Sequence, residues 1–199
     1  MIIYLIISEY IPPLHSRYVS FVRISKSIAE YSKTRLVLIS FLIFMGTVIF
    51  ILPAQSVDSP GESPDLSIFY TIDDLYRIAE SYGEDGRTEY IQARLTFDVI
   101  WPLVYTFFLA SSISWSFIKG FGENSRWLYT NLLPIAGLLL DYLENVAVVI
   151  VMWNYPARTP VIDFAATVFT PLKWMSLGFS FLLLFVGVGK IVWNKIGVK

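Results

Sequence analysis

Four long apolar runs dominate the chain and alternate with shorter polar segments. They cover residues 36–52, 97–118, 127–153 and 164–192. Because a helix rises about 1.5 Å per residue, each run is long enough to cross the roughly 30 Å hydrocarbon core of a bilayer. Tryptophans, whose rings prefer the headgroup level, lie at or near several ends of these runs: Trp101, Trp127, Trp153 and Trp193. The pattern predicts an all-α, polytopic membrane protein, a bundle of four transmembrane helices.

Residues 14–31 show the pattern of a different kind of helix. Apolar positions recur at helical spacing and charged positions take the other faces. The apolar positions are Leu14, Tyr18, Phe21, Val22, Ile28 and Ala29, and the charged ones are Arg23, Lys26, Glu30 and, just beyond, Lys33. This predicts a basic amphipathic helix lying at the membrane surface as an anchor, or as a helix that docks a lipid or a partner. Residues 1–7 are apolar but too short to span, and they lack signal-peptide features.

The loop between the first two spans, residues 53–96, carries helix signals of its own. Thr71 is a good N-cap, and Asp74 three residues later gives a capping-box pattern. Gly83 is a natural left-handed terminator for a helix over residues 71–82. A second helix is expected to begin at residues 84–85 and to run directly into the second span. Together they predict a short helical cap on one side of the membrane.

The distribution of basic residues predicts the orientation. Ten of the fifteen Lys and Arg residues flank the spans on the side of the two termini, and four lie on the side of the 53–96 loop. By the positive-inside rule, both termini are cytoplasmic and the helical cap is extracytoplasmic, with the protein in the cell membrane. We therefore divide the chain into a cytoplasmic segment, residues 1–35, and one transmembrane domain, residues 36–193, that includes the 53–96 loop.

Composition excludes several kinds of chemistry. Sixteen acidic residues balance fifteen basic ones, so no basic field points to nucleic acid. The chain has no cysteine and a single histidine, His15. Disulfides, thiolate nucleophiles, thiolate zinc sites, iron–sulfur clusters and multi-histidine metal sites within one chain are therefore ruled out. No motif for a cofactor is present either, and we expect neither a metal nor a cofactor.

Ionisable residues inside the third and fourth spans are the strongest functional signal. Asp141, Glu144 and Asn145 are spaced i, i+3, i+4, which places them on one helix face near the middle of the bilayer. Lys173 lies nine residues from the outer end of the fourth span, and Glu144 lies nine from that of the third. Matching depths predict an ion pair of Lys173 with Glu144 or Asp141. A helix-packing clamp and a binding site explain such a group equally well.

A second stripe of charge descends from the cap into the second span. Arg87, Tyr90 and Arg94 are spaced i, i+3, i+7, and Asp98 follows Arg94 by four. The stripe fits an ordered cap held by Arg–carboxylate pairs, or a site for an anion or lipid headgroup. The candidate ligand-binding set is therefore Arg87, Arg94, Asp98, Asp141, Glu144, Asn145 and Lys173; no catalytic residue is assigned.

Small residues in the second and fourth spans favour close helix packing. Ala110/Ser114 and Ser112/Ser116 are small-xxx-small pairs, which suit core packing or dimerisation. The Gly-x-Gly at residues 187–189 lacks the strand and the third glycine of a nucleotide-binding loop.

Two sequence runs resemble a known pattern. YGEDGR at residues 82–87, followed by Tyr90, Asp98, Pro102 and Tyr105, and DYLEN at residues 141–145 resemble a prokaryotic family of four-span integral membrane proteins. The resemblance covers about residues 36–193. The family has no assigned activity, so the resemblance implies an architecture and a shared site, and it transfers no catalytic residue.

Three functions fit these observations. The first is a small binding or scaffold protein whose polar cluster opens to the outer side and holds a lipid headgroup or small polar ligand. The second is a lipid-modifying enzyme that uses carboxylate–lysine acid–base chemistry. The third is an oligomeric transporter of ions or small solutes. Because no nucleophile or metal set is present, we favour the first, with the lipid bilayer and a second copy of the chain as expected partners.

Overall fold

A computed structural model describes residues 14–55, 63–64 and 67–197. The described residues form helices and no strand. The long helices are α2 (Leu14–Tyr31), α3 (Thr34–Gly46), α4 (Ile72–Phe121), α5 (Leu133–Asn154) and α6 (Pro160–Ile196). Shorter turns are the π-helical η1 (Thr47–Ile51) and the 3-10 helices η2 (Leu52–Gln55) and η4 (Arg126–Leu132). The apolar residues 1–7 lie outside the described part of the chain.

Four helical stretches are long and apolar enough to cross a membrane, which confirms that part of the prediction. They are Thr34–Ile51, Ile72–Phe121, Arg126–Asn154 and Pro160–Ile196. The first continues from α3 into the π-helical turn η1. The third is divided: η4 precedes α5, and Pro134 occupies the first turn of α5, where a missing N–H leaves no hydrogen bond unmade.

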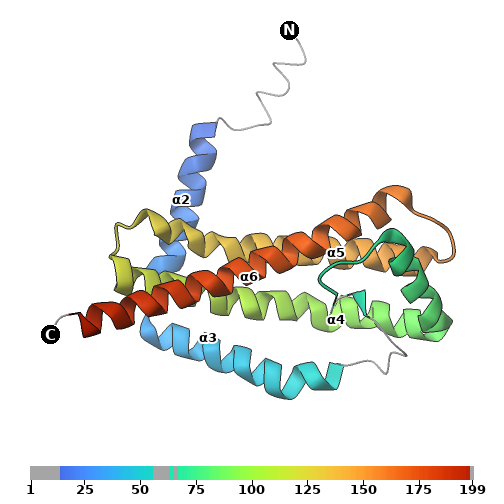
Figure 1. Cartoon of the computed structure of the whole chain (residues 1–199), viewed down its shortest axis with the longest axis horizontal. Coiled ribbons are helices and arrows are strands. Elements are labelled where there is room, and N and C mark those ends of the chain that lie inside the picture. The colour runs from blue at the N-terminus through green and yellow to red at the C-terminus, as the bar shows by residue number, and fades with distance from the viewer. Residues whose placement is uncertain (1–13, 56–62, 65–66, 198–199) are drawn as a thin grey trace, which may run out of the picture.

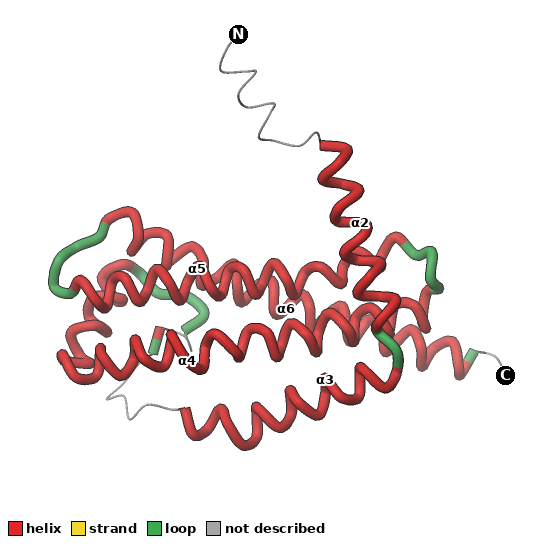
Figure 2. The backbone as a smooth tube through the Cα atoms, turned by 180° about the vertical axis from the view of Figure 1, so that it is seen from behind, coloured by secondary structure: helices red, strands yellow, loops and turns green. Residues whose placement is uncertain are grey.

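The helices α4, α5 and α6 lie alongside one another, and α3 packs mainly on α4 at the edge of the bundle (Figures 1 and 2). In both views α2 projects from the side of the bundle, near the end where α6 terminates, and its C-terminal half lies against the other helices. This arrangement puts the start of α3, the end of α4, the start of α5 and the end of α6 at one end, and the cap at the other.

Aromatic and aliphatic side chains of α4 form the core of the bundle. Tyr105, Leu109, Ile113 and Phe117 are buried there, and Phe44 of α3 stacks on Phe108 at 4.7 Å between ring centroids. Their spacing of three and four residues along α4 places them on one face. The second span is therefore the central helix, in contact with all the others.

The first arm of α4, residues 72–82, is here called the cap, and it begins with the capping box that the sequence predicts. Thr71 and Asp74 make the reciprocal capping box, with the Asp74 N–H donating to Thr71 Oγ1 at 3.2 Å. At Gly83 the backbone takes φ of 64° and the helix bends sharply before it continues into the span. Leu75 and Ala79 of the arm pack on residues of α5 and α6. The two expected cap helices are thus one kinked helix with the second span.

The capping box contains a carboxylate with a lowered pKa, that of Asp74. The Thr71 hydroxyl donates to Asp74 at 2.6 Å and, together with the Arg77 guanidinium, holds the pKa of Asp74 well below its usual range. A carboxylate with a depressed pKa stabilises the fold at every pH above its unfolded pKa of about 3.9, and this contribution is lost only as the pH falls through the lower folded value. The start of the cap is therefore insensitive to pH under ordinary conditions.

Hydrogen bonds join α2 to the bundle. The Ser25 hydroxyl donates to the Leu128 carbonyl at 3.3 Å, and the Asn131 side-chain amide donates to the Ser25 carbonyl at 3.0 Å and to Ser114 Oγ at 2.8 Å. All of these groups are buried, so each bond satisfies a group that water does not reach. The predicted helix at residues 14–31 is confirmed with the same bounds, and its second half is fixed to the other helices.

The helices α4 and α6 approach each other closely at Gly187, and this contact gives a stability prediction. A Cβ added there would lie 2.3 Å from Ser116 Oγ and 2.8 Å from its Cβ. We expect Gly187→Ala to lower the free energy of unfolding by about 1–3 kcal/mol, as overpacking does in other cores. The measurement is unfolding in detergent micelles, followed by circular dichroism.

Gly189→Ala is the matched control, because nothing lies within 4 Å of a Cβ at Gly189 on the same helix. This change should be neutral or slightly stabilising through helix propensity. Equal behaviour of the two variants would contradict the close approach at Gly187.

Candidate functional site: a buried polar cluster

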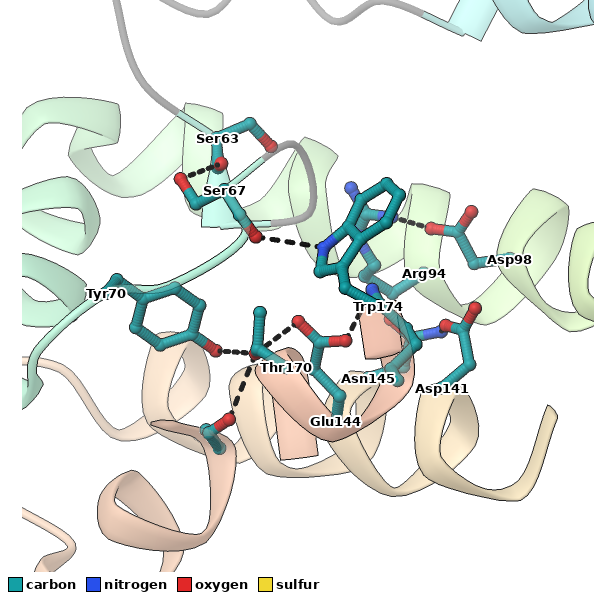
Figure 3. Close-up of polar contacts among 12 residues, drawn as sticks. Ser63, Ser67, Tyr70, Arg94, Asp98, Asp141, Glu144, Asn145, Thr170 and Trp174 are labelled. Carbon is teal, nitrogen blue, oxygen red and sulfur yellow. Dashed lines mark hydrogen bonds and ion pairs between the residues drawn. The ribbon is translucent and has the colours of Figure 1, made fainter. Parts of the chain in front are cut away.

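The three polar residues of α5 share one face, as their spacing predicts, and that face points into the bundle. Asp141, Glu144 and Asn145 are all buried. Lys173 reaches them from α6 and is buried as well. The polar cluster, defined by these four residues with Arg94 and Asp98 of α4, therefore draws on all three central helices (Figure 3).

Glu144 and Lys173 form the predicted ion pair. Lys173 Nζ lies 2.5 Å from Glu144 Oε2, and the exposed fractions of the two residues are 5% and 0%. The second carboxylate oxygen, Oε1, accepts a hydrogen bond from Thr170 Oγ1 at 2.6 Å. Since α6 begins at Pro160, Lys173 lies more than three turns inside the helix. The sequence predicts either Glu144 or Asp141 as the ion-pair partner of Lys173, and in the structure Lys173 pairs with Glu144.

Asp141 accepts hydrogen bonds from two neutral side chains. Its Oδ2 accepts from the Tyr105 hydroxyl at 2.9 Å, and its Oδ1 accepts from the Asn145 side-chain amide at 3.0 Å. Tyr105 belongs to α4, so this carboxylate joins α4 to α5 as Glu144 joins α5 to α6. Two neighbouring carboxylates on one helix face thus have dissimilar environments.

The charged residues along α4 have two locations: Arg94 and Asp98 belong to the cluster, and Arg87 lies at the cap. Arg94 pairs with Asp98, as predicted, and its guanidinium lies over the Tyr90 ring, 4.4 Å from the centroid. Arg87 does not contact the cluster. It donates to the Ala79 carbonyl at 3.1 Å and lies over the Tyr155 ring at 4.7 Å. Arg87 therefore joins the two arms of α4 across the kink at Gly83.

The chain segment before the cap closes over the cluster (Figure 3). The Tyr70 and Thr170 hydroxyls are 2.9 Å apart, and Tyr70 is buried. The indole N–H of Trp174 donates to the Ser67 carbonyl at 3.0 Å. A continuous path of polar contacts thus runs from Lys173 through Glu144, Thr170 and Tyr70 to the segment that enters the cap.

Three members of this network were not among the predicted site residues: Tyr70, Tyr105 and Thr170. Thr170 had a usable signal, because it precedes Lys173 by three and shares its face of α6. Tyr105 follows Asp98 by seven on α4, which gives the same kind of signal. Tyr70 lies outside regular structure, where spacing predicts no direction, so only the fold reveals it.

The chemistry open to the cluster is limited by its closure. Among the described residues no group of three or more metal-ligating side chains comes together. Two hollows formed by the described residues, of about 560 and 370 Å³, are lined by other residues than those of the cluster. An acidic group, an ammonium and two hydroxyls are therefore present, but they face one another. Such an arrangement suits a rigid connection between helices better than contact with a substrate.

No family model, curated protein or solved structure matches this chain. Its function is therefore inferred from the cluster and from the distribution of charge and apolar surface.

The Glu144–Lys173 pair predicts a strong stability effect. Glu144→Gln leaves a buried ammonium without its counter-ion, and removing one partner of a buried pair costs about 3–5 kcal/mol. Lys173→Gln should cost a similar amount for the converse reason. In the double variant no uncompensated charge remains, so its loss should be smaller than the sum of the two single losses. Unfolding in detergent micelles measures all three.

The exposed pair Arg158–Asp73 is the control, with nitrogen and oxygen 3.2 Å apart. Asp73→Asn should change stability by only about 0–1 kcal/mol, because surface pairs are worth little. Additive losses in the Glu144/Lys173 cycle would show that the two residues do not interact.

Proposed function

We propose that this protein is an integral membrane scaffold with both termini in the cytoplasm and the cap outside. In this proposal the polar cluster locks the cap onto the transmembrane helices instead of converting a substrate. The observation that supports it best is the complete burial of Glu144, with one oxygen on Lys173 and the other on Thr170. A small binding role would use the cap surface that this lock holds in place.

The proposed topology rests on charge and shape together. The end of the bundle that carries the start of α3 and the end of α6 holds most of the basic residues. The opposite end carries the acidic cap, and α2 projects from the side of the bundle as a helix in the membrane plane would (Figure 1). Positive charge at the cytoplasmic surface and an amphipathic helix at that surface are consistent with one another.

Closure of the cluster favours a scaffold over a ligand site. A ligand that contacts Glu144 or Lys173 would need a path to groups with exposed fractions of 0% and 5%. A polar group buried in its own hydrogen-bond network also gains nothing by exchanging partners unless the new ones are better placed.

The same access problem weighs against an enzyme or a transporter. Asp141 and Glu144 do have unequal surroundings, which acid–base catalysis requires. A substrate would still have to displace Tyr70 and Thr170 to reach them. Transport by alternating access ordinarily uses two repeats that rock against each other, and four spans would need a second copy of the chain.

Cysteine labelling tests the topology, and the chain offers a clean background because it has no native cysteine. Ala157→Cys, in the exposed loop between α5 and α6, should react with a membrane-impermeant maleimide in intact cells. Lys195→Cys, exposed near the end of α6, should react only after the cells are opened. The reverse result would place the cap in the cytoplasm and overturn the proposed orientation.

Mass spectrometry of co-purifying compounds tests the scaffold role. Lipids and metabolites extracted from the purified wild type and from Glu144→Gln should be the same, because no compound contacts the cluster. The Gly187→Ala protein serves as the control, because it is also expected to lose stability but lies away from the cluster, near Ser116. A polar compound present with the wild type and Gly187→Ala but absent from Glu144→Gln would refute the scaffold and support a ligand site.

A further inference from the structure

Two hollows lie at the end of the bundle opposite the cap, on either side of α2. The first, here called the charged hollow, has a volume of about 560 Å³ and is lined by Lys26, Lys33 and Lys119, with Trp115 in its wall. The second, here called the apolar groove, has about 370 Å³ and is lined by side chains such as Ile28, Tyr31, Leu36, Phe107 and Ile135. Both volumes lie within the roughly 300–1,000 Å³ typical of small-ligand sites.

The helix α2 separates a polar region from an apolar one. Lys26 and Ala29 face the charged hollow, whereas Ser27, Ile28 and Tyr31 face the apolar groove. Ser32 borders both, so the two spaces meet at the turn between α2 and α3. Along α4, the groove touches residues 106–111 and the hollow touches residues 115–119. The groove is therefore the deeper of the two in the membrane.

The three lysines of the charged hollow have no ion-pair partner among the described residues. Two carboxylates, Glu30 and Glu123, also line the hollow, but neither makes an ion pair there. Three ammonium groups against two carboxylates leave one positive charge in excess. The indole N–H of Trp115 donates to Thr34 Oγ1 at 3.1 Å, which fixes the wall at the level where tryptophan meets lipid headgroups.

We propose that these two spaces together form a binding site for one anionic phospholipid. The phosphodiester, with a single negative charge, occupies the charged hollow near Lys26, Lys33 and Lys119. One acyl chain enters the apolar groove, whose inward surface is almost entirely hydrocarbon. Basic pockets between transmembrane helices recognise anionic headgroups in this way.

The charged hollow and the apolar groove meet at Ser32, and this junction favours a lipid as the occupant. A free phosphate would use the charged hollow and leave the groove empty, and a detergent-like apolar molecule would do the opposite. A phospholipid joins a charged group to a hydrocarbon chain by a short linker, and here a charged space adjoins an apolar one. The charged hollow is separate from the polar cluster, because Trp115 follows Tyr105, which binds Asp141, by ten residues on α4, a rise of about 15 Å. The groove reaches closer, to Thr106 beside Tyr105.

Native mass spectrometry of the full chain in detergent tests the site, with phosphatidylglycerol and phosphatidylcholine titrated in parallel. The wild type should bind one phosphatidylglycerol more tightly than phosphatidylcholine. The triple variant Lys26→Gln/Lys33→Gln/Lys119→Gln should lose that preference. Each lysine near an anionic surface is worth about fivefold in affinity, so the combined loss should be at least tenfold.

The matched control removes three cations at the same end that line neither space: Arg23, Arg35 and Arg126. Their replacement by Gln should change the affinity for phosphatidylglycerol less than threefold. A groove variant, Ser27→Phe, adds a ring on the exposed face of α2 that borders the groove and should weaken binding of both lipids.

Three results would overturn the proposal. Equal losses in the lysine and arginine triples would show a general surface effect instead of a site. Competition by inorganic phosphate at the concentration of the lipid would show a free-anion site. Equal binding of both lipids by the wild type would show no charge recognition, and this last measurement needs no variant to fold.

Discussion

The ion pair between Glu144 and Lys173 is the constraint on which the packing of this protein depends. Two charges can be buried only if they face each other and their remaining hydrogen-bonding groups are satisfied. Lys173 and Thr170 meet this requirement from one helix, so α6 can take a single register against α5. A shift by one residue would turn Lys173 away from Glu144. The pair therefore determines how α5 and α6 are arranged more than it adds net stability to the fold.

The same pair explains how the cap is held. Thr170 connects Glu144 to Tyr70, and Tyr70 directly precedes the capping box that starts the first arm of α4. Apolar contacts of that arm with α5 and α6 bury Leu75, Ile78 and Ala79. These contacts are non-directional, whereas the hydroxyl contacts fix the angle at which the chain enters. At the opposite end, hydrogen bonds among the neutral groups of Ser25, Asn131 and Ser114 hold α2 against the bundle.

Features that follow from the spacing of residues along the sequence could be predicted. Features that depend on contacts between segments distant in the sequence could not. The helix at residues 14–31, the capping box at Thr71 and the shared face of Asp141 and Glu144 are local patterns, and the structure contains each of them. The choice of Glu144 over Asp141 depends on how α5 and α6 rotate, which spacing does not encode. Tyr70 was missed for a related reason, because its segment has no period, and Arg87 serves the kink at Gly83 instead of the cluster.

The polar cluster is buried, whereas the charged hollow is open, so the two polar regions have different physical roles. In the buried cluster Glu144 pairs with Lys173 and Arg94 with Asp98, and Asp141 accepts two hydrogen bonds, so these groups already have partners within the fold. The lysines of the charged hollow keep their full capacity for an anion, because no described carboxylate pairs with them. A group contributes to binding a partner only if its interaction with the partner is more favourable in free energy than its interactions within the folded chain. By that criterion the proposed lipid site around α2 is better suited to bind another molecule than the buried cluster is.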